Sequence, residues 1–237
     1  MALQREADNL KALRAVGAGA RKSVIEVFDF LEDYDGRGSH ALVMEAGEED
    51  LVGRVKRGGA LSRKELKKAC AAAVEVLLAL EKNQLVWTDL RASNFVVMPT
   101  QRGTGRGGGG VKAIDLESAV PVGEKPVDCT PEVALLYVQG RLTQALVATS
   151  YDVWSLGILL VFLASGGRSL FDGEASSRVM VSLASVRQEK VEGQVEKSVS
   201  DGKTAALIKK LVVVDPRQRP SVAAIKRDLL IFLQGRD

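Results

Sequence analysis

The chain is poor in cysteine and histidine and carries little net charge, and each of these features excludes a class of protein. Cys70 and Cys129 are the two cysteines among 237 residues, which is too few for a disulfide framework, and they form no Cys-x-x-Cys pair. His40 is the single histidine, which excludes His-rich zinc sites and mechanisms that need two imidazoles. The 33 basic and 30 acidic residues are interleaved rather than gathered in one patch, so we expect no nucleic-acid partner.

Long apolar runs and leader-like segments are also missing. The longest apolar stretch covers residues 156–164, which is too short to cross a hydrocarbon core of roughly 30 Å. The N-terminal segment is charged from Arg5 onward and has no apolar core, unlike a signal peptide. With so few cysteines, these features predict an intracellular protein, most simply a cytoplasmic one, with no membrane partner.

The hydrophobic pattern predicts an α+β chain whose C-terminal part is mostly helical. The apolar fraction of 46% and the charged fraction of 27% are ordinary for a globular protein, and the length suits one domain or two small lobes. Helices are expected at the N-terminus, from Ser62 onward, and at residues 151–163, 205–213 and 222–233. Strands are expected at residues 24–30, 41–44, 85–87, 95–98 and 111–116.

A glycine-rich stretch at residues 99–110 contains a formal Gly-x-Gly-x-x-Gly that starts at Gly103. A phosphate-binding loop needs a strand before it and a helix N-terminus after it. Here a strand follows instead, so the pattern favours a flexible hairpin insertion.

Three oxygen-bearing side chains are expected at the ends of neighbouring short strands. Asp89 and Asn94 stand five residues apart in one loop, and Asp115 ends the next strand. Asn and Asp oxygens are hard ligands that suit Mg²⁺, which also takes phosphate oxygens. Arg91 lies two residues after Asp89 and can direct its charge at a phosphoryl group in transfer.

The order of these residues resembles the eukaryotic-type protein kinase family. The segments that carry the resemblance are TDLRASN (88–94), IDLE (114–117), TPE (130–132), DVWSLG (152–157) and DPRQRP (215–220). Aminoglycoside-type kinases share the Asp-Asn-Asp core, but the last two segments favour the protein-kinase branch. The resemblance implies ATP as phosphate donor, Mg²⁺ as cofactor and a protein hydroxyl as acceptor. It implies Asp89 and Arg91 as catalytic residues and Asn94 and Asp115 as metal ligands.

The resemblance covers essentially the whole chain as a single kinase-like domain. It implies a remnant N-lobe and hinge at residues 1–46 and a mostly helical C-lobe at residues 47–237. Glu6 takes the place of the ion-pairing Glu of helix C, and Arg219 that of the Arg that pairs with the Glu of the APE motif, here Glu132. The nucleotide-contacting positions are Met44, Glu45, Gly47, Asp50 and Val96.

Several family features are absent or altered. The chain begins at helix C, without counterparts of the first three strands, the Gly-rich loop and the strand-3 Lys, so we expect Glu6 to be a solvated helix residue. Trp87 replaces the His of the HRD motif and is expected in an apolar spine beside Leu10 and Leu116. Thr88 replaces its Arg, so control by phosphorylation of the activation segment is not expected. Glu117 replaces the Gly of DFG.

Two functions remain open from the sequence. The first is an ATP-dependent protein kinase, of serine/threonine type by default, although the wording DLRASN is somewhat similar to tyrosine kinases. The second is a pseudokinase that serves as a non-catalytic interaction scaffold for a protein partner. Both predict that two N-lobe strands expose an apolar face, which favours self-association.

Overall fold

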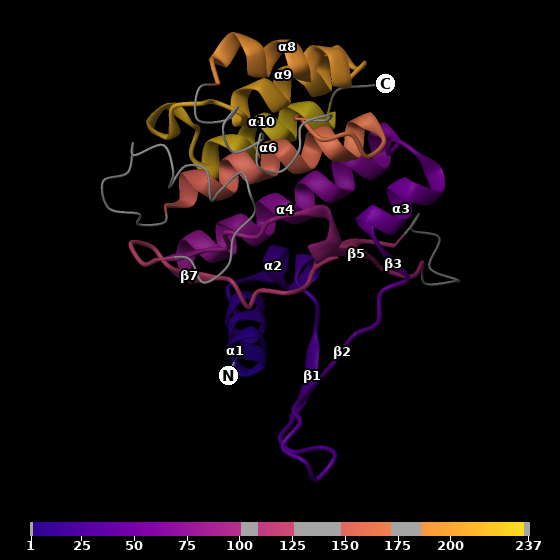
Figure 1. Ribbon diagram of the computed structural model, residues 1–237, viewed down its shortest axis with the longest axis vertical. Helices are drawn as coiled ribbons and strands as arrows, with labels where there is room; N and C mark the ends of the chain where they lie inside the picture. Colours follow the sequence, from indigo (N-terminus) through magenta and orange to yellow (C-terminus); the bar gives the residue numbers. More distant parts are fainter. Residues whose placement is uncertain (1, 101–108, 126–147, 172–185, 235–237) are drawn as a thin grey trace.

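The structure is a computed structural model that describes residues 2–100, 109–125, 148–171 and 186–234 (Figure 1). Its helices are α1 (Ala2–Ala15), α2 (Ala18–Ser23), α3 (Leu51–Gly58), α4 (Arg63–Lys82), α6 (Thr149–Ser165), α8 (Gln188–Ser198), α9 (Gly202–Leu211) and α10 (Val222–Gln234). Its strands are β1 (Val27–Leu31), β2 (Ala41–Met44), β3 (Glu49–Asp50), β4 (Leu85–Val86), β5 (Phe95–Val97), β6 (Val111–Ala113) and β7 (Val120–Pro121). Two 3-10 turns, η1 (Ala92–Asn94) and η2 (Pro216–Gln218), complete the described elements.

The predicted α+β class with a mostly helical C-terminal part is confirmed. Helices α4, α6, α8, α9 and α10 form the larger body, while α1 and the β1–β2 hairpin lie together at the opposite end of the molecule (Figure 1). The strands form three small sheets, β1–β2, β3–β5–β6 and β4–β7, in which every pair is antiparallel. These short sheets connect the two ends and hold the loops that carry the candidate site.

Helix α4 begins as the sequence predicts. The Ser62 side chain accepts a hydrogen bond from the Glu65 N–H, and the Glu65 carboxylate accepts one from the Ser62 N–H, so the capping box is complete. The predicted apolar stripe is buried along its whole length: Leu66, Cys70, Ala73, Leu77 and Leu80. The buried stripe lets α4 pack against α2, α6 and α10 on different sides.

Helix α6 is the most buried helix in the described part of the chain. Eleven of its 17 residues are buried, as its apolar sequence predicts. It packs against α4 and α9. A Cβ at Gly157 would lie 2.5 Å from Val212 Cγ1, so only glycine permits this close approach to the end of α9. This packing fixes the position of Asp152 in the first turn of α6.

The N-terminal part differs from the prediction in detail. The segment 24–30 is not one strand, because Val24 ends α2 and makes an isolated parallel bridge to Ala113 before β1 starts at Val27. The strand predicted at 111–116 ends at Ala113, because Asp115 takes the left-handed conformation with φ +58°. Helices α2, α3 and α8 and strands β3 and β7 were not predicted from the sequence.

Candidate active site

The loop between β4 and β5 is held in place by a side chain of helix α6. The Asp152 carboxylate accepts hydrogen bonds from the N–H groups of Trp87 (2.8 Å) and Thr88 (3.0 Å). Thr88 has φ +66°, a conformation that costs a non-glycine residue energy and that these hydrogen bonds help to maintain. Burial raises the pKa of Asp152 to about 7, although its two backbone hydrogen bonds lower it. These contacts fix the backbone of the loop at the two residues that precede Asp89.

Asp89 lies at the centre of the loop and is 7% exposed. Its Oδ2 accepts a hydrogen bond from Asn94 Nδ2 at 3.0 Å, and Arg91 Nε lies 3.1 Å from the same oxygen. Asn94 Nδ2 also donates to the Asp89 main-chain carbonyl at 2.9 Å. The structure thus brings together three residues that the sequence predicted for the site. A carboxylate oriented in this way can accept the proton of a hydroxyl group placed before it.

The β5–β6 ladder positions the two predicted metal ligands. Phe95 pairs with Ala113, and the Ile114 N–H donates to the Asn94 carbonyl at 2.9 Å. Asp115 therefore directly follows the residue that is hydrogen-bonded to Asn94. With Asn94 Nδ2 turned to Asp89, its Oδ1 accepts a hydrogen bond from Ser93 Oγ at 3.2 Å, and this oxygen and the Asp115 carboxylate would supply only oxygen donors to a metal. Two protein oxygens fit Mg²⁺, which keeps several waters and takes the remaining ligands from phosphates.

A network of hydrogen bonds ties the segment after β6 to the catalytic loop. The Trp87 indole N–H donates to the Asp115 carbonyl at 2.9 Å, and Ser118 Oγ donates to the Trp87 carbonyl at 2.8 Å. Thr88 Oγ1 donates to the Ser118 carbonyl at 3.3 Å. Leu10, Trp87 and Leu116 are all fully buried, as the spine prediction requires. Sequence reasoning missed Ser118 as a bridging residue, since nothing local marks a contact across 31 residues.

Helix α1 turns one face toward the Asp115 segment, and the prediction of a solvated Glu6 was wrong. Glu6 is 8% exposed. Its burial, followed by the negative charges of Asp115 and Glu117, raises the pKa of its carboxyl, while hydrogen bonding by the Asp115 main chain lowers it. One turn later, Asn9 Nδ2 donates to the Leu116 carbonyl at 2.9 Å. The helix is docked by polar contacts on this segment, which a spacing argument cannot reveal.

The residues predicted to contact the nucleotide gather around β5. Asp50 pairs with Val96 in the β3–β5 ladder, and a Cβ at Gly47 would lie only 2.7 Å from Val96 Cβ. The Glu45 carboxylate forms an ion pair with Lys112, which is the β6 partner of Val96. Four of the five positions therefore lie around one point of the sheet.

Met44 and Asp50 also have clear local roles. Met44 ends β2, opposite Val27, one residue before Glu45. Asp50 caps α3, with its Oδ1 accepting a hydrogen bond from the Gly53 N–H at 2.6 Å. One oxygen of Asp50 is thus already engaged by the fold.

Two predicted features fall on residues outside the described ranges. These are the glycine motif that starts at Gly103 and the pairing of Arg219 with Glu132. Arg219 itself is described: it donates to the carbonyls of Ser150, Val213 and Val214 and lies over the Trp154 ring at 4.9 Å. Burial lowers the pKa of Arg219 to about 10.

Comparison with known proteins identifies the family. The model of the protein kinase domain matches residues 2–231, so the chain belongs to the protein kinase family. It is 25% identical over 204 residues to calcium-dependent protein kinase 31 of Arabidopsis thaliana, which covers 84% of this chain and 40% of the relative. It is 25% identical over 203 residues to calcium-dependent protein kinase 29 of the same plant, covering 83% and 36%.

A third relative comes from another organism. The chain is 28% identical over 184 residues to a Dictyostelium discoideum protein named "Probable serine/threonine-protein kinase fhkD", with 73% of this chain and 24% of the relative covered. The chain thus matches less than half the length of these curated relatives. Membership of the family implies ATP, a divalent metal and protein substrates. Among the described helices, none is both long and apolar enough to cross a membrane.

Proposed function

We propose that this chain is a serine/threonine protein kinase that transfers the γ-phosphoryl group of Mg-ATP to a protein hydroxyl. The observation that carries the proposal is the arrangement of Asp89, whose Oδ2 lies 3.0 Å from Asn94 Nδ2 and 3.1 Å from Arg91 Nε. All three relatives are named as protein kinases, and the name of the Dictyostelium discoideum relative supports the choice of serine and threonine as acceptors.

Each residue of this cluster has a chemical role in the proposal. Asp89 orients the substrate hydroxyl and accepts its proton as the hydroxyl oxygen bonds to the γ-phosphorus, while the bond from that phosphorus to the β–γ bridging oxygen breaks and ADP leaves. Arg91 has a side chain 56% exposed, so its guanidinium is available to the phosphoryl oxygens on which charge develops. Asn94 and Asp115 hold Mg²⁺ through their side-chain oxygens. When bound, Mg²⁺ would supply charge neutralisation on the phosphates.

The nucleotide lies against β5 in this proposal. Val96 and Met44 contact the base, while Glu45 and Gly47 offer backbone groups at its edge, and Asp50 lies near the ribose. The ion pair of Glu45 with Lys112 and the close contact of Gly47 with Val96 support the proposal because they hold these backbone groups in one place. Positioning is the main requirement for phosphoryl transfer, so a rigid edge of this kind favours it.

The test combines nucleotide binding with phosphotransfer. Mg-ATP at 100 times its Kd should stabilise the chain by about 2.7 kcal/mol, read as a rise in Tm. Asp115→Asn should remove this shift, whereas Asp89→Asn should keep it and lower phosphotransfer by about 10²-fold or more. Asp228→Asn is the matched control, because Asp228 lies on α10 in a surface ion pair with Lys210. The scaffold alternative requires that neither the original chain nor any of the variants transfers phosphate.

A further inference from the structure

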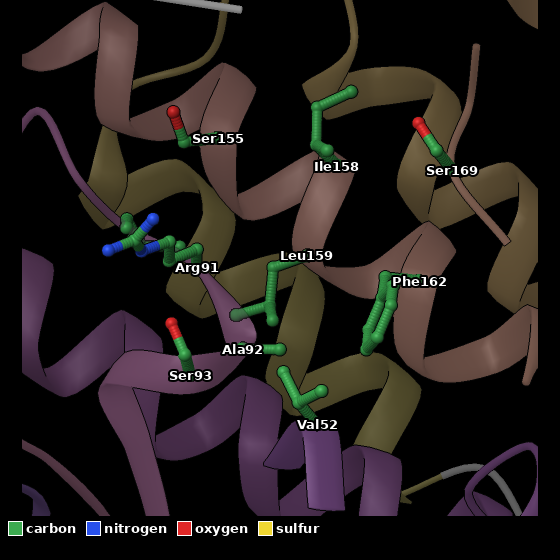
Figure 2. A pocket seen from close by; sticks show the side chains of 10 residues that line it. Val52, Arg91, Ala92, Ser93, Ser155, Ile158, Leu159, Phe162 and Ser169 are labelled. Carbon is green, nitrogen blue, oxygen red and sulfur yellow. The ribbon is translucent and has the colours of Figure 1, made fainter. Parts of the chain in front are cut away.

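A pocket opens directly beside the catalytic loop (Figure 2). It has a volume of about 260 Å³ and lies between the loop, helix α6 and the first turn of α3. Its described lining consists of Val52, Leu90, Arg91, Ala92, Ser93, Ser155, Ile158, Leu159, Phe162 and Ser169. Figure 2 shows Phe162, Leu159 and Val52 gathered around its apolar side, with Arg91 and Ser93 at the side of the catalytic loop.

The pocket is continuous with the proposed catalytic centre. Leu90 and Arg91 line it, and they are the two residues that follow Asp89. Arg91 Nε lies 3.1 Å from Asp89 Oδ2, so one side chain borders both the pocket and the catalytic carboxylate. An extended peptide advances roughly 3.3 Å per residue. A substrate with its hydroxyl at Asp89 therefore has neighbouring side chains within reach of the pocket.

The size of the pocket suits one side chain. Pockets for whole small molecules usually exceed about 300 Å³. Peptide recognition more often depends on single apolar anchors that fill small recesses of this kind. Apolar groups from α3 and α6 form much of the wall, so a leucine side chain buried there is stabilised by the hydrophobic effect.

The charges around the pocket exclude a basic occupant. Its described lining contains no carboxylate, and its only charged residue there is Arg91. The remaining polar lining residues are serines, which are neutral. An arginine or lysine would lose hydration without gaining a partner and would meet the positive charge of Arg91. An acidic residue would compete with Asp89 for the same guanidinium.

We propose that this pocket selects substrates that carry an aliphatic residue, such as leucine, within about two residues of the accepting serine or threonine. This inference rests on the proposed kinase function and names the substrate class for it. The selection acts through Ile158, Phe162 and Val52, which are half-buried and free to gain contacts when the side chain enters.

Peptide binding can be measured without phosphotransfer. The whole chain, labelled at isoleucine δ1-methyl groups, is titrated with serine peptides that differ only at the neighbouring residue, which is leucine, arginine or glutamate. Ile158→Val identifies the signal of Ile158. We expect the leucine peptide to shift this signal and to bind at least tenfold more tightly than the other two. Equal binding of all three peptides, or an unchanged Ile158 signal, would overturn the proposal.

A charge introduced into the pocket should reverse the preference. Phe162→Glu should weaken the leucine peptide at least tenfold and favour the arginine peptide. The matched control is Phe28→Glu, the same change on the β1–β2 hairpin, where the side chain is already 63% exposed. If Phe162→Glu does not fold, Ser93→Glu places a carboxylate in the same pocket at a half-buried position. An unchanged preference in the folded variant would contradict the assignment of the pocket.

The two proposals fail in different ways. Phosphotransfer that shows no preference for leucine would overturn the pocket assignment and leave the kinase function standing. Leucine-selective binding at Ile158 with no phosphotransfer to any peptide would overturn the substrate role and the kinase function together.

Discussion

The indole N–H of Trp87 donates a hydrogen bond to the main-chain carbonyl of Asp115 at 2.9 Å. The two residues lie 28 positions apart, one at the start of the catalytic loop and the other just after β6. Trp87 is fully buried, and its ring packs against Phe95 with 5.4 Å between the centroids. An indole thus links the residue proposed to hold Mg²⁺ to the loop that holds Asp89.

Replacement of this indole should weaken both the fold and the metal site. Trp87→Phe removes the donor and leaves a gap beside Phe95, so we expect a loss of about 2 kcal/mol in the free energy of unfolding. Because the Asp115 carbonyl loses its partner, the Tm shift produced by Mg-ATP should also shrink. The comparison variant is Trp154→Phe, whose ring lies beneath Arg219 rather than beside Asp115. A Mg-ATP shift of equal size in both variants would contradict a positioning role for Trp87.

Asp152 should make stability depend on pH in an unusual direction. Burial raises its pKa in the folded chain to about 7, above the ordinary aspartate pKa of 3.8. Between these two values the folded chain binds more protons than the unfolded chain. The contribution of Asp152 to stability is therefore complete below about pH 4 and is lost as the pH rises toward 7.

The measurement is urea unfolding of the original chain and of Asp152→Asn across pH 4 to 8. Because other groups titrate in both proteins, the difference between the two isolates Asp152. We expect the free energy of unfolding of the original chain to fall relative to that of Asp152→Asn as the pH rises from 4 toward 7. A constant difference would mean that the hydrogen bonds from Trp87 and Thr88 keep the carboxylate ionised throughout.

Local sequence signals predicted five of the eight described helices and the catalytic loop. Ser62 and Glu65 identified the start of α4 because a capping box involves only residues three apart. The spacing of Asp89 and Asn94 identified the loop for the same reason, since their hydrogen bond lies within one turn. Helix α3 was missed although Asp50 caps it and Leu51 and Val55 stand four residues apart, because its eight residues include two glycines, which disfavour a helix.

Contacts between distant segments could not be predicted in the same way. The burial of Glu6 depends on how α1 docks against Asp115, more than a hundred residues later, and nothing in the helix itself reveals this. Thr88 shows the same limit. The sequence showed that Thr88 replaces the Arg of the HRD motif, but it did not predict that the Thr88 hydroxyl donates to the Ser118 carbonyl. Such contacts follow from the tertiary arrangement of the elements rather than from their patterns.

Gly47 should tolerate no side chain. A Cβ there would lie 2.7 Å from Val96 Cβ, and neither backbone can move freely because Glu48 N–H donates to the Val97 carbonyl at 2.8 Å. Gly47→Ala should cost about 1–3 kcal/mol in stability and weaken ATP binding. Val96→Gly should lower the cost of Gly47→Ala when the two changes are combined, because it removes the Cβ that the new side chain meets.

A second glycine provides the control for this prediction. Gly193 lies inside α8, and a Cβ there meets no atom within 4 Å. Gly193→Ala should therefore stabilise the chain by about 0.5–1 kcal/mol through helix propensity alone. Chemical unfolding of the variants gives the comparison. Equal effects at the two glycines would show that Gly47 is not constrained by Val96.

The β1–β2 hairpin should make the chain associate with itself. Phe28 is 63% exposed and Val43 39% exposed, and within the described strands β1 and β2 pair only with each other. Apolar side chains beside unpaired strand edges favour contact with another chain. Phe28→Ser with Val43→Thr should therefore reduce association, and Tm should stay within a few degrees because neither side chain is buried. Light scattering after size-exclusion chromatography measures the mass of both proteins. A monomeric original chain at the highest concentration would contradict this expectation, since the exposed face would then have no tendency to associate.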